Sequence, residues 1–259
     1  MAAINPLYTL SGFFVGLLVG LTGVGGGSLM TPLLVLLFGI HPATAVGTDL
    51  LYAAATKSVG TAVHGFNRSV DWRVVGRLAT GSVPTTLATG LLLNWLGAGG
   101  DGSAKLISFV LGIAVLITAV LLLARGRLLT YFGPYINPDG PRHARVLTML
   151  TGAVLGVLVT LSSVGAGALG VTALVLLYPR MPTARIVGSD IAHAVPLTLL
   201  AGSLHWWMGS VDWHLLLSLL TGSVPGIVVG SMLAVRVPDR VIRPALACVL
   251  AIVGGRLVF

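Results

Sequence analysis

Charged side chains are scarce in this sequence: 8% of its residues are Asp, Glu, Lys or Arg, against about 25% in soluble domains. The first charged residue is Asp49, and none lies between Arg145 and Arg180. Hydrophobic residues make up 56% of the chain. This balance excludes an ordinary soluble domain and indicates a multi-pass protein of the cell (inner) membrane, in contact with lipid.

Cysteine is almost absent as well. Because Cys248 is the single cysteine, the chain forms no internal disulfide, and no Cys/Met/His cluster suggests a metal or another cofactor. The HExxH, Walker-loop and nucleophile-elbow motifs are missing, which argues against an enzyme. Basic residues outnumber acidic ones by 15 to 7. They lie in short loops, where the positive-inside rule explains them without a nucleic-acid partner.

The two halves of the chain resemble each other at an offset of 140 to 141 residues. Gly47–Leu50 matches Gly188–Ile191, and Thr80–Pro84 matches Thr221–Pro225. Such matches in the same order indicate an internal duplication.

The loop charges predict that the two halves are inverted. Loop 65–77 carries three arginines, whereas its counterpart 206–218 carries none, so the two loops are expected on opposite sides of the membrane. We therefore expect an all-α fold with two inverted repeats, 1–124 and 146–259, joined by a cytoplasmic linker, 125–145. The expected apolar segments are 7–22, 28–40, 46–64, 75–96 and 104–124, then 146–161, 166–178, 186–207, 213–235 and 241–258.

The second segment of each half is shorter than the ~20 residues of a spanning helix. Whether the first two segments of each half cross fully or form a broken hairpin is left open. Glycines at four-residue spacing in 12–20 and 222–230 predict close helix packing. Four tryptophans are expected to anchor the chain at the membrane interface: Trp72, Trp206, Trp207 and Trp213.

Glycine-rich runs interrupt the apolar sequence at equivalent places, Gly23–Ser28 and Leu161–Ala168. Each helical glycine costs ~1 kcal/mol relative to alanine, so these runs predict opened backbone, which a bilayer tolerates only where protein buries it or it lines a cavity. Free N–H groups at such breaks suit a small anion; close helix crossing is the alternative. No strand precedes the run, which excludes a dinucleotide fingerprint. The expected substrate-binding residues near the breaks are Thr22, Gly25, Gly26, Gly27, Ser28, Thr48, Ser162, Ser163, Gly165, Gly167 and Ser189.

Four ionisable residues occur in apolar surroundings. Asp49 and Asp190 each open the third segment of a half, as N-cap carboxylates or as proton carriers. Lys57 follows Asp49 by two helical turns and needs an acid or an anionic ligand as partner. We expect it to bind substrate, with a structural Asp–Lys pair as the alternative. His193 shares a helix face with Asp190 and could pass protons with it.

The motifs as a group resemble a known family. Gly23–Ser28 followed by Pro32, then Gly47–Asp49, Val70–Trp72 and Gly81–Pro84, resemble the TauE/SafE family of sulfite and organosulfur-anion transporters. The resemblance covers almost the whole chain. It implies a secondary transporter driven by the proton motive force, with protons as coupling ion. Members are usually described as exporters of small anions such as sulfite or sulfonates.

Two other functions remain open at this point. The chain could be a passive anion channel, or a membrane subunit that transports nothing. The sequence also leaves open whether it forms a homo-oligomer.

Overall fold

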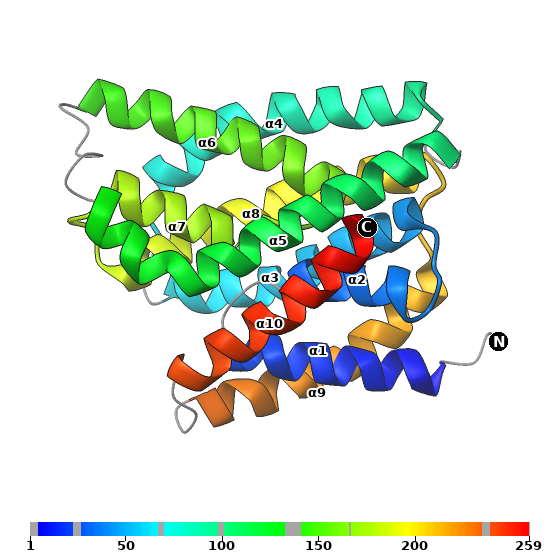
Figure 1. Cartoon of the computed structure of the whole chain (residues 1–259). Coiled ribbons are helices and arrows are strands. Elements are labelled where there is room, and N and C mark those ends of the chain that lie inside the picture. Colours follow the sequence, from blue (N-terminus) through cyan, green and yellow to red (C-terminus); the bar gives the residue numbers. More distant parts are fainter. Residues whose placement is uncertain are drawn as a thin grey trace.

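The structure, a computed structural model, describes residues 5–22, 27–66, 70–97, 101–132, 141–165, 167–234 and 239–258. Over these ranges the chain forms ten α-helices and no β-strand (Figure 1), as the predicted all-α class requires. The first five helices are α1 (Pro6–Thr22), α2 (Gly27–Leu36), α3 (Pro42–Phe66), α4 (Trp72–Trp95) and α5 (Asp101–Phe132). The second five are α6 (Pro141–Ser162), α7 (Ala168–Leu177), α8 (Thr183–Trp207), α9 (Trp213–Ala234) and α10 (Asp239–Val258).

The helices follow the predicted apolar segments, and the main differences lie at their ends. α5 continues to Phe132 instead of ending near residue 124, and α6 begins at Pro141, so both ends of the expected linker are helical. Hydropathy marks where apolar surface stops, whereas Arg and Leu are good helix formers that extend α5 beyond that point. α3 likewise begins early, at Pro42, whose fixed φ angle suits a first helical position.

Several helices have the character of membrane spans. Within the described residues, four are long and apolar enough to cross a bilayer. They contain Ala104–Ala124, His143–Ser162, Thr183–Trp207 and Trp213–Gly230. α2 and α7 have 10 residues each, which agrees with the predicted partial spans. Large apolar side chains are exposed on most helices, and the four tryptophans expected at the interface are also exposed. These features fit a multi-pass membrane protein.

The helices pack in pairs that join the two halves of the chain. α3 and α8 pack together at the centre, between an α4–α6 pair on one side and an α1–α9 pair on the other (Figure 1). α5 and α10 form the remaining large contact and lie across the bundle. The short helices α2 and α7 pack on α3 and α8, respectively. Each helix of the α3–α8 pair therefore has the short helix of its own half beside it.

Glycines allow the outer pairs to approach closely, as their spacing predicts. A Cβ atom at Gly12 would meet the backbone of Leu219, and one at Gly222 would meet the backbone of Thr9. Equivalent contacts occur in the α4–α6 pair, where a Cβ at Gly152 would meet the Leu78 backbone. These glycines therefore serve helix packing.

Candidate functional site

Two aspartates are buried in the central helices. Asp49 of α3 is 0% exposed and Asp190 of α8 is 1% exposed. Because α3 begins at Pro42 and α8 at Thr183, both carboxylates lie inside a helix and not at its first residue. The N-cap alternative considered for them is therefore wrong. Two acids within apolar helices are more typical of an ion or proton site.

Each carboxylate contacts the short helix of its own half. Thr31 of α2 donates from Oγ1 to Oδ2 of Asp49 at 2.5 Å. The backbone N–H of Gly167 lies near the Asp190 carboxylate and interacts favourably with its negative charge, although no hydrogen bond of normal geometry joins them. Gly170 of α7 lies so close to Oδ1 of Asp190 that a Cβ atom there would collide with it. The glycine thus makes room for the carboxylate, as small residues do at close approaches.

Lys57 brings the two acids into one electrostatic site. The partly buried side chain comes from α3 and attracts both Asp49 and Asp190. The positive charge of Lys57 also interacts electrostatically with His193. Two acids, one base and one histidine, from one helix of each half, therefore form a polar centre in an apolar bundle. The sequence predicted these four residues, and the helix packing gathers them.

The second glycine break adjoins both acids. α6 ends at Ser162, and the backbone then takes positive φ angles at Ser163, Gly165 and Gly167 (57°, 127° and 128°). The opened backbone predicted for this stretch is therefore present. The Ser162 hydroxyl bonds to backbone groups of its own segment. The Ser163 hydroxyl faces the Asp49 carboxylate, although no hydrogen bond of normal geometry joins them.

The first break is only partly described. Gly25 and Gly26 lie outside the described residues. Thr22 is the last residue of α1 and Gly27 the first of α2, with helical backbone but no described side-chain environment. Ser28 is buried near the start of α2. The predicted interruption itself, at 23–26, lies outside the described residues.

Thr48 and Ser189 connect helices across the two halves. The Thr48 hydroxyl accepts from the backbone N–H of Asp212 at 3.1 Å. The Ser189 hydroxyl accepts from the N–H of Asp71 at 2.8 Å. Asp71 and Asp212 in turn accept from the first N–H groups of α4 and α9. Both hydroxyls thus fix the start of a helix from the other half.

Four contacting residues were not singled out from the sequence. His193 shares a hydrogen bond of 2.9 Å, through Nε2, with Oγ of Ser82 on α4. Tyr52, the repeat counterpart of His193, lies beside Ser223 of α9, the counterpart of Ser82. Thr31 binds Asp49 as described. A signal was available, since Thr31 follows Ser28 by one turn and Ser82 belongs to the repeated Gly-Ser-Val-Pro motif.

Unpaired polar atoms concentrate around this centre. Oδ1 of Asp49, Oγ of Ser163, Oδ1 of Asp190 and Nδ1 of His193 are buried and have no hydrogen-bond partner among the described residues. Buried polar atoms normally have partners. A cluster from three segments therefore offers acceptors and donors to a small polar species. The described part of the chain contains no group of three or more His, Cys, Asp or Glu side chains that could hold a metal.

A bundle of apolar helices around a buried charged centre with broken short helices is the architecture of a membrane transporter. Comparison with known proteins agrees: the model of the family "Sulfite exporter TauE/SafE" matches residues 8–257. The chain belongs to the TauE/SafE family, which is a family of membrane transporters and not of enzymes.

The named relatives carry general descriptions. A "Probable membrane transporter protein YjnA" of Bacillus subtilis (strain 168) is 40% identical, over 96% of this chain and 98% of the relative. A "Probable membrane transporter protein" of Xylella fastidiosa (strain 9a5c) is 30% identical, over 87% and 83%. One of Methanocaldococcus jannaschii, MJ0441, is 23% identical, over 81% and 75%. No solved structure matches the chain.

Proposed function

We propose that the protein is a secondary transporter that exports a small sulfur-containing anion, such as sulfite or a sulfonate, across the cytoplasmic membrane using the proton motive force. The observation that carries this proposal is the Asp49–Lys57–Asp190 centre, whose two acids are buried, beside a broken helix. The family description supplies the substrate class. An inside-negative membrane potential favours outward movement of an anion by about 2.3 kcal/mol per charge per 100 mV.

The proposed architecture is a pair of inverted repeats, α1–α5 and α6–α10. In these repeats α1 corresponds to α6, α3 to α8, α4 to α9 and α5 to α10. Under this correspondence the α1–α9 contact is equivalent to the α6–α4 contact, and the α3–α8 and α5–α10 contacts are each equivalent to themselves. The hydrogen bonds follow the same correspondence, since Thr48–Asp212 corresponds to Ser189–Asp71. Both relations support a two-fold axis through the centre, where inverted-repeat transporters bind substrate.

In the proposed site the anion contacts the Lys57 ammonium, the Ser163 hydroxyl and N–H groups at the breaks. Lys57 supplies the positive charge, and helix-terminal N–H groups supply donors without side-chain charge. Thr48 and Ser189 are proposed to position Asp49 and Asp190 rather than touch substrate, because their hydroxyls already bind backbone. The remaining proposed contacts are the residues at the two breaks, namely Thr22, Gly25, Gly26, Gly27, Ser28, Ser162, Gly165 and Gly167.

The charge count of the centre suggests how protons enter the cycle. With both carboxylates ionised, Asp49 and Asp190 outweigh Lys57, and the net negative centre repels an anion. Protonation of one aspartate makes the centre neutral. Anion binding and proton binding therefore favour each other, and this coupling is reciprocal. An anion that carries more charge than the proton bound with it is still driven outward by the membrane potential. His193, held by Ser82, is the proposed further proton acceptor near Asp190.

The test is flux of labelled sulfite into proteoliposomes, with and without a pH gradient, for the wild type and two variants. Lys57→Met removes the central cation, whereas the control Lys105→Met removes an exposed one on α5. We expect accumulation that a protonophore abolishes, unchanged in the control. Sulfite flux through the Lys57→Met variant should fall about tenfold or more, because hydrogen bonds to charged groups contribute about 1.5–3 kcal/mol.

Other outcomes would overturn parts of this proposal. Normal flux in Lys57→Met would exclude the proposed role of that residue. Downhill flux without accumulation would indicate a passive anion channel. Sulfonate flux in the absence of sulfite flux would exclude sulfite as the substrate and leave the rest of the proposal intact. No flux of any tested anion would favour a non-transporting subunit.

A further inference from the structure

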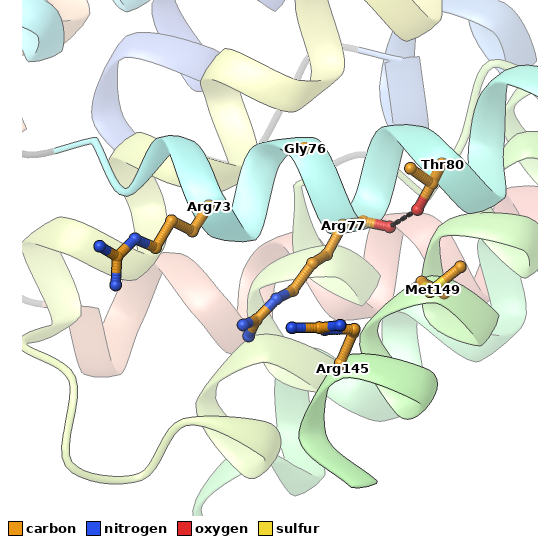
Figure 2. A pocket seen from close by; sticks show the side chains of 6 residues that line it. All are labelled: Arg73, Gly76, Arg77, Thr80, Arg145 and Met149. Atoms are coloured by element: carbon orange, nitrogen blue, oxygen red, sulfur yellow. Dashed lines mark hydrogen bonds between the residues drawn. The ribbon is translucent and has the colours of Figure 1, made fainter. Parts of the chain in front are cut away.

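A basic hollow lies on the surface, and none of its lining residues belongs to the buried centre. It measures about 510 Å³ and lies between the N-terminal parts of α4 and α6. Its lining is Arg73, Gly76, Arg77, Thr80, Arg145 and Met149. Figure 2 shows that the side chains of Arg77 and Arg145 reach toward each other, whereas Arg73 extends away from this pair. Two guanidinium groups from different helices thus converge on one space.

The part of the chain that the structure describes holds no acidic group that neutralises this pair. Within the described residues, no ion pair joins Arg73, Arg77 or Arg145 to a carboxylate. Among the residues that the structure describes, the acid nearest in sequence to the hollow is Asp71, which faces Arg185 at 3.6 Å and caps α4. Adjacent like charges repel each other. An anion between the two guanidinium groups would remove that repulsion.

Arg77 is held in place by its neighbours. Its Nη1 atom donates to the Tyr178 hydroxyl at 3.2 Å. That hydroxyl shares a hydrogen bond of 2.7 Å with Oγ1 of Thr148 on α6. Because Tyr178, directly after α7, and Thr148 of α6 hold the guanidinium, less side-chain entropy remains to be lost when it binds an anion.

The other half of the chain shows that helix packing does not need these arginines. At the repeat positions of Arg145 and Arg77 stand Asn5 and Ser218, at the corresponding end of the α1–α9 pair. There the backbone N–H of Asn5 donates to Oγ of Ser218 at 3.3 Å. The α1–α9 pair packs closely without any charge. The positive-inside rule accounts for arginines at this end, but not for their convergence on one hollow.

Apolar surface continues from the hollow along the same two helices. Val83 and Leu87 of α4, and Val146 and Leu150 of α6, are exposed. A soluble ion gains nothing from that surface, whereas acyl chains would cover it. We propose that the hollow binds the phosphate group of an anionic lipid. Arg77 and Arg145 hold the phosphate oxygens, with the planar donor geometry that suits arginine for phosphate.

The proposal is tested by binding of phosphatidylglycerol and phosphatidylcholine to the purified full chain, measured by native mass spectrometry. The test variant is Arg77→Gln/Arg145→Gln. The control, Arg127→Gln/Arg256→Gln, removes two exposed charges from α5 and α10. We expect about 30-fold weaker phosphatidylglycerol binding in the test variant, from about fivefold per arginine, and an unchanged control.

Two further arms keep the result decisive. Arg77→Lys/Arg145→Lys keeps the charges and should recover part of the binding, which separates a local effect from misfolding. Inorganic phosphate and sulfite are added as competitors at millimolar concentration. Equal phosphatidylglycerol binding by wild type and test variant would overturn the proposal. Displacement of the lipid by either free ion would identify a site for soluble oxyanions instead. Because no flux is measured, failure here would leave the proposed transport function untouched.

Discussion

The hydrogen bond between Thr31 and Asp49 is the contact whose loss should be easiest to measure. Thr31 is 0% exposed, and its hydroxyl donates to the buried carboxylate at 2.5 Å. Thr31→Val keeps nearly the same volume and removes only the donor. Oδ1 of Asp49 already has no partner among the described residues. The variant would therefore leave the carboxylate without its hydroxyl donor on α2.

The expected cost follows from the charge of the acceptor. A hydrogen bond to a charged group contributes about 1.5–3 kcal/mol. In a chain of this size each kcal/mol moves the melting midpoint by roughly 2–4 °C. Thr31→Val should therefore melt about 3–12 °C below the wild type in detergent. Sulfite flux should fall as well, because α2 no longer holds the carboxylate.

The matched control is Thr118→Val. Thr118 is also buried, but its hydroxyl donates to the Ala114 carbonyl of the same helix, so its loss should change stability little. A double-mutant cycle with Asp49→Asn then isolates the pair. In the Asp49→Asn background, Thr31→Val should lower the melting midpoint by less than it does in the wild type. Equal melting midpoints for Thr31→Val and Thr118→Val would refute the assigned role of Thr31.

Two glycine substitutions test the packing that shapes the site. Gly170→Ala places a methyl group against the Asp190 carboxylate. It should reduce sulfite flux while changing the melting midpoint little. Normal flux would show that transport does not depend on the present position of the Asp190 carboxylate. Gly222→Ala places a methyl group against the Thr9 backbone. It should destabilise the chain by about 1–3 kcal/mol, whereas the control Gly76→Ala meets open space and should gain about 0.5–1 kcal/mol. Equal melting midpoints for these two variants would contradict the close α1–α9 approach.

Local patterns in the sequence were sufficient for the helices and for the charged residues of the centre. Apolar runs predicted the ten helices that the structure describes, because a bilayer requires continuous apolar surface and internal backbone bonding. The scarcity of charge singled out Asp49, Lys57 and Asp190. Hydropathy could not predict that α5 continues to Phe132. The residues after 124 are less apolar but still favour a helix.

Tertiary structure alone decided which groups meet. Thr31 and Ser82 are ordinary hydroxyl residues in sequence, and only the packing of α2 on α3 and α4 on α8 brings them to Asp49 and His193. The same packing turned Ser189 toward the backbone of Asp71. A side chain's partner depends on the rotation and spacing of two helices, which one helix's sequence does not encode. The sequence by itself thus determined a helical membrane bundle with a few charged residues inside its apolar helices. The packing of those helices determined the site.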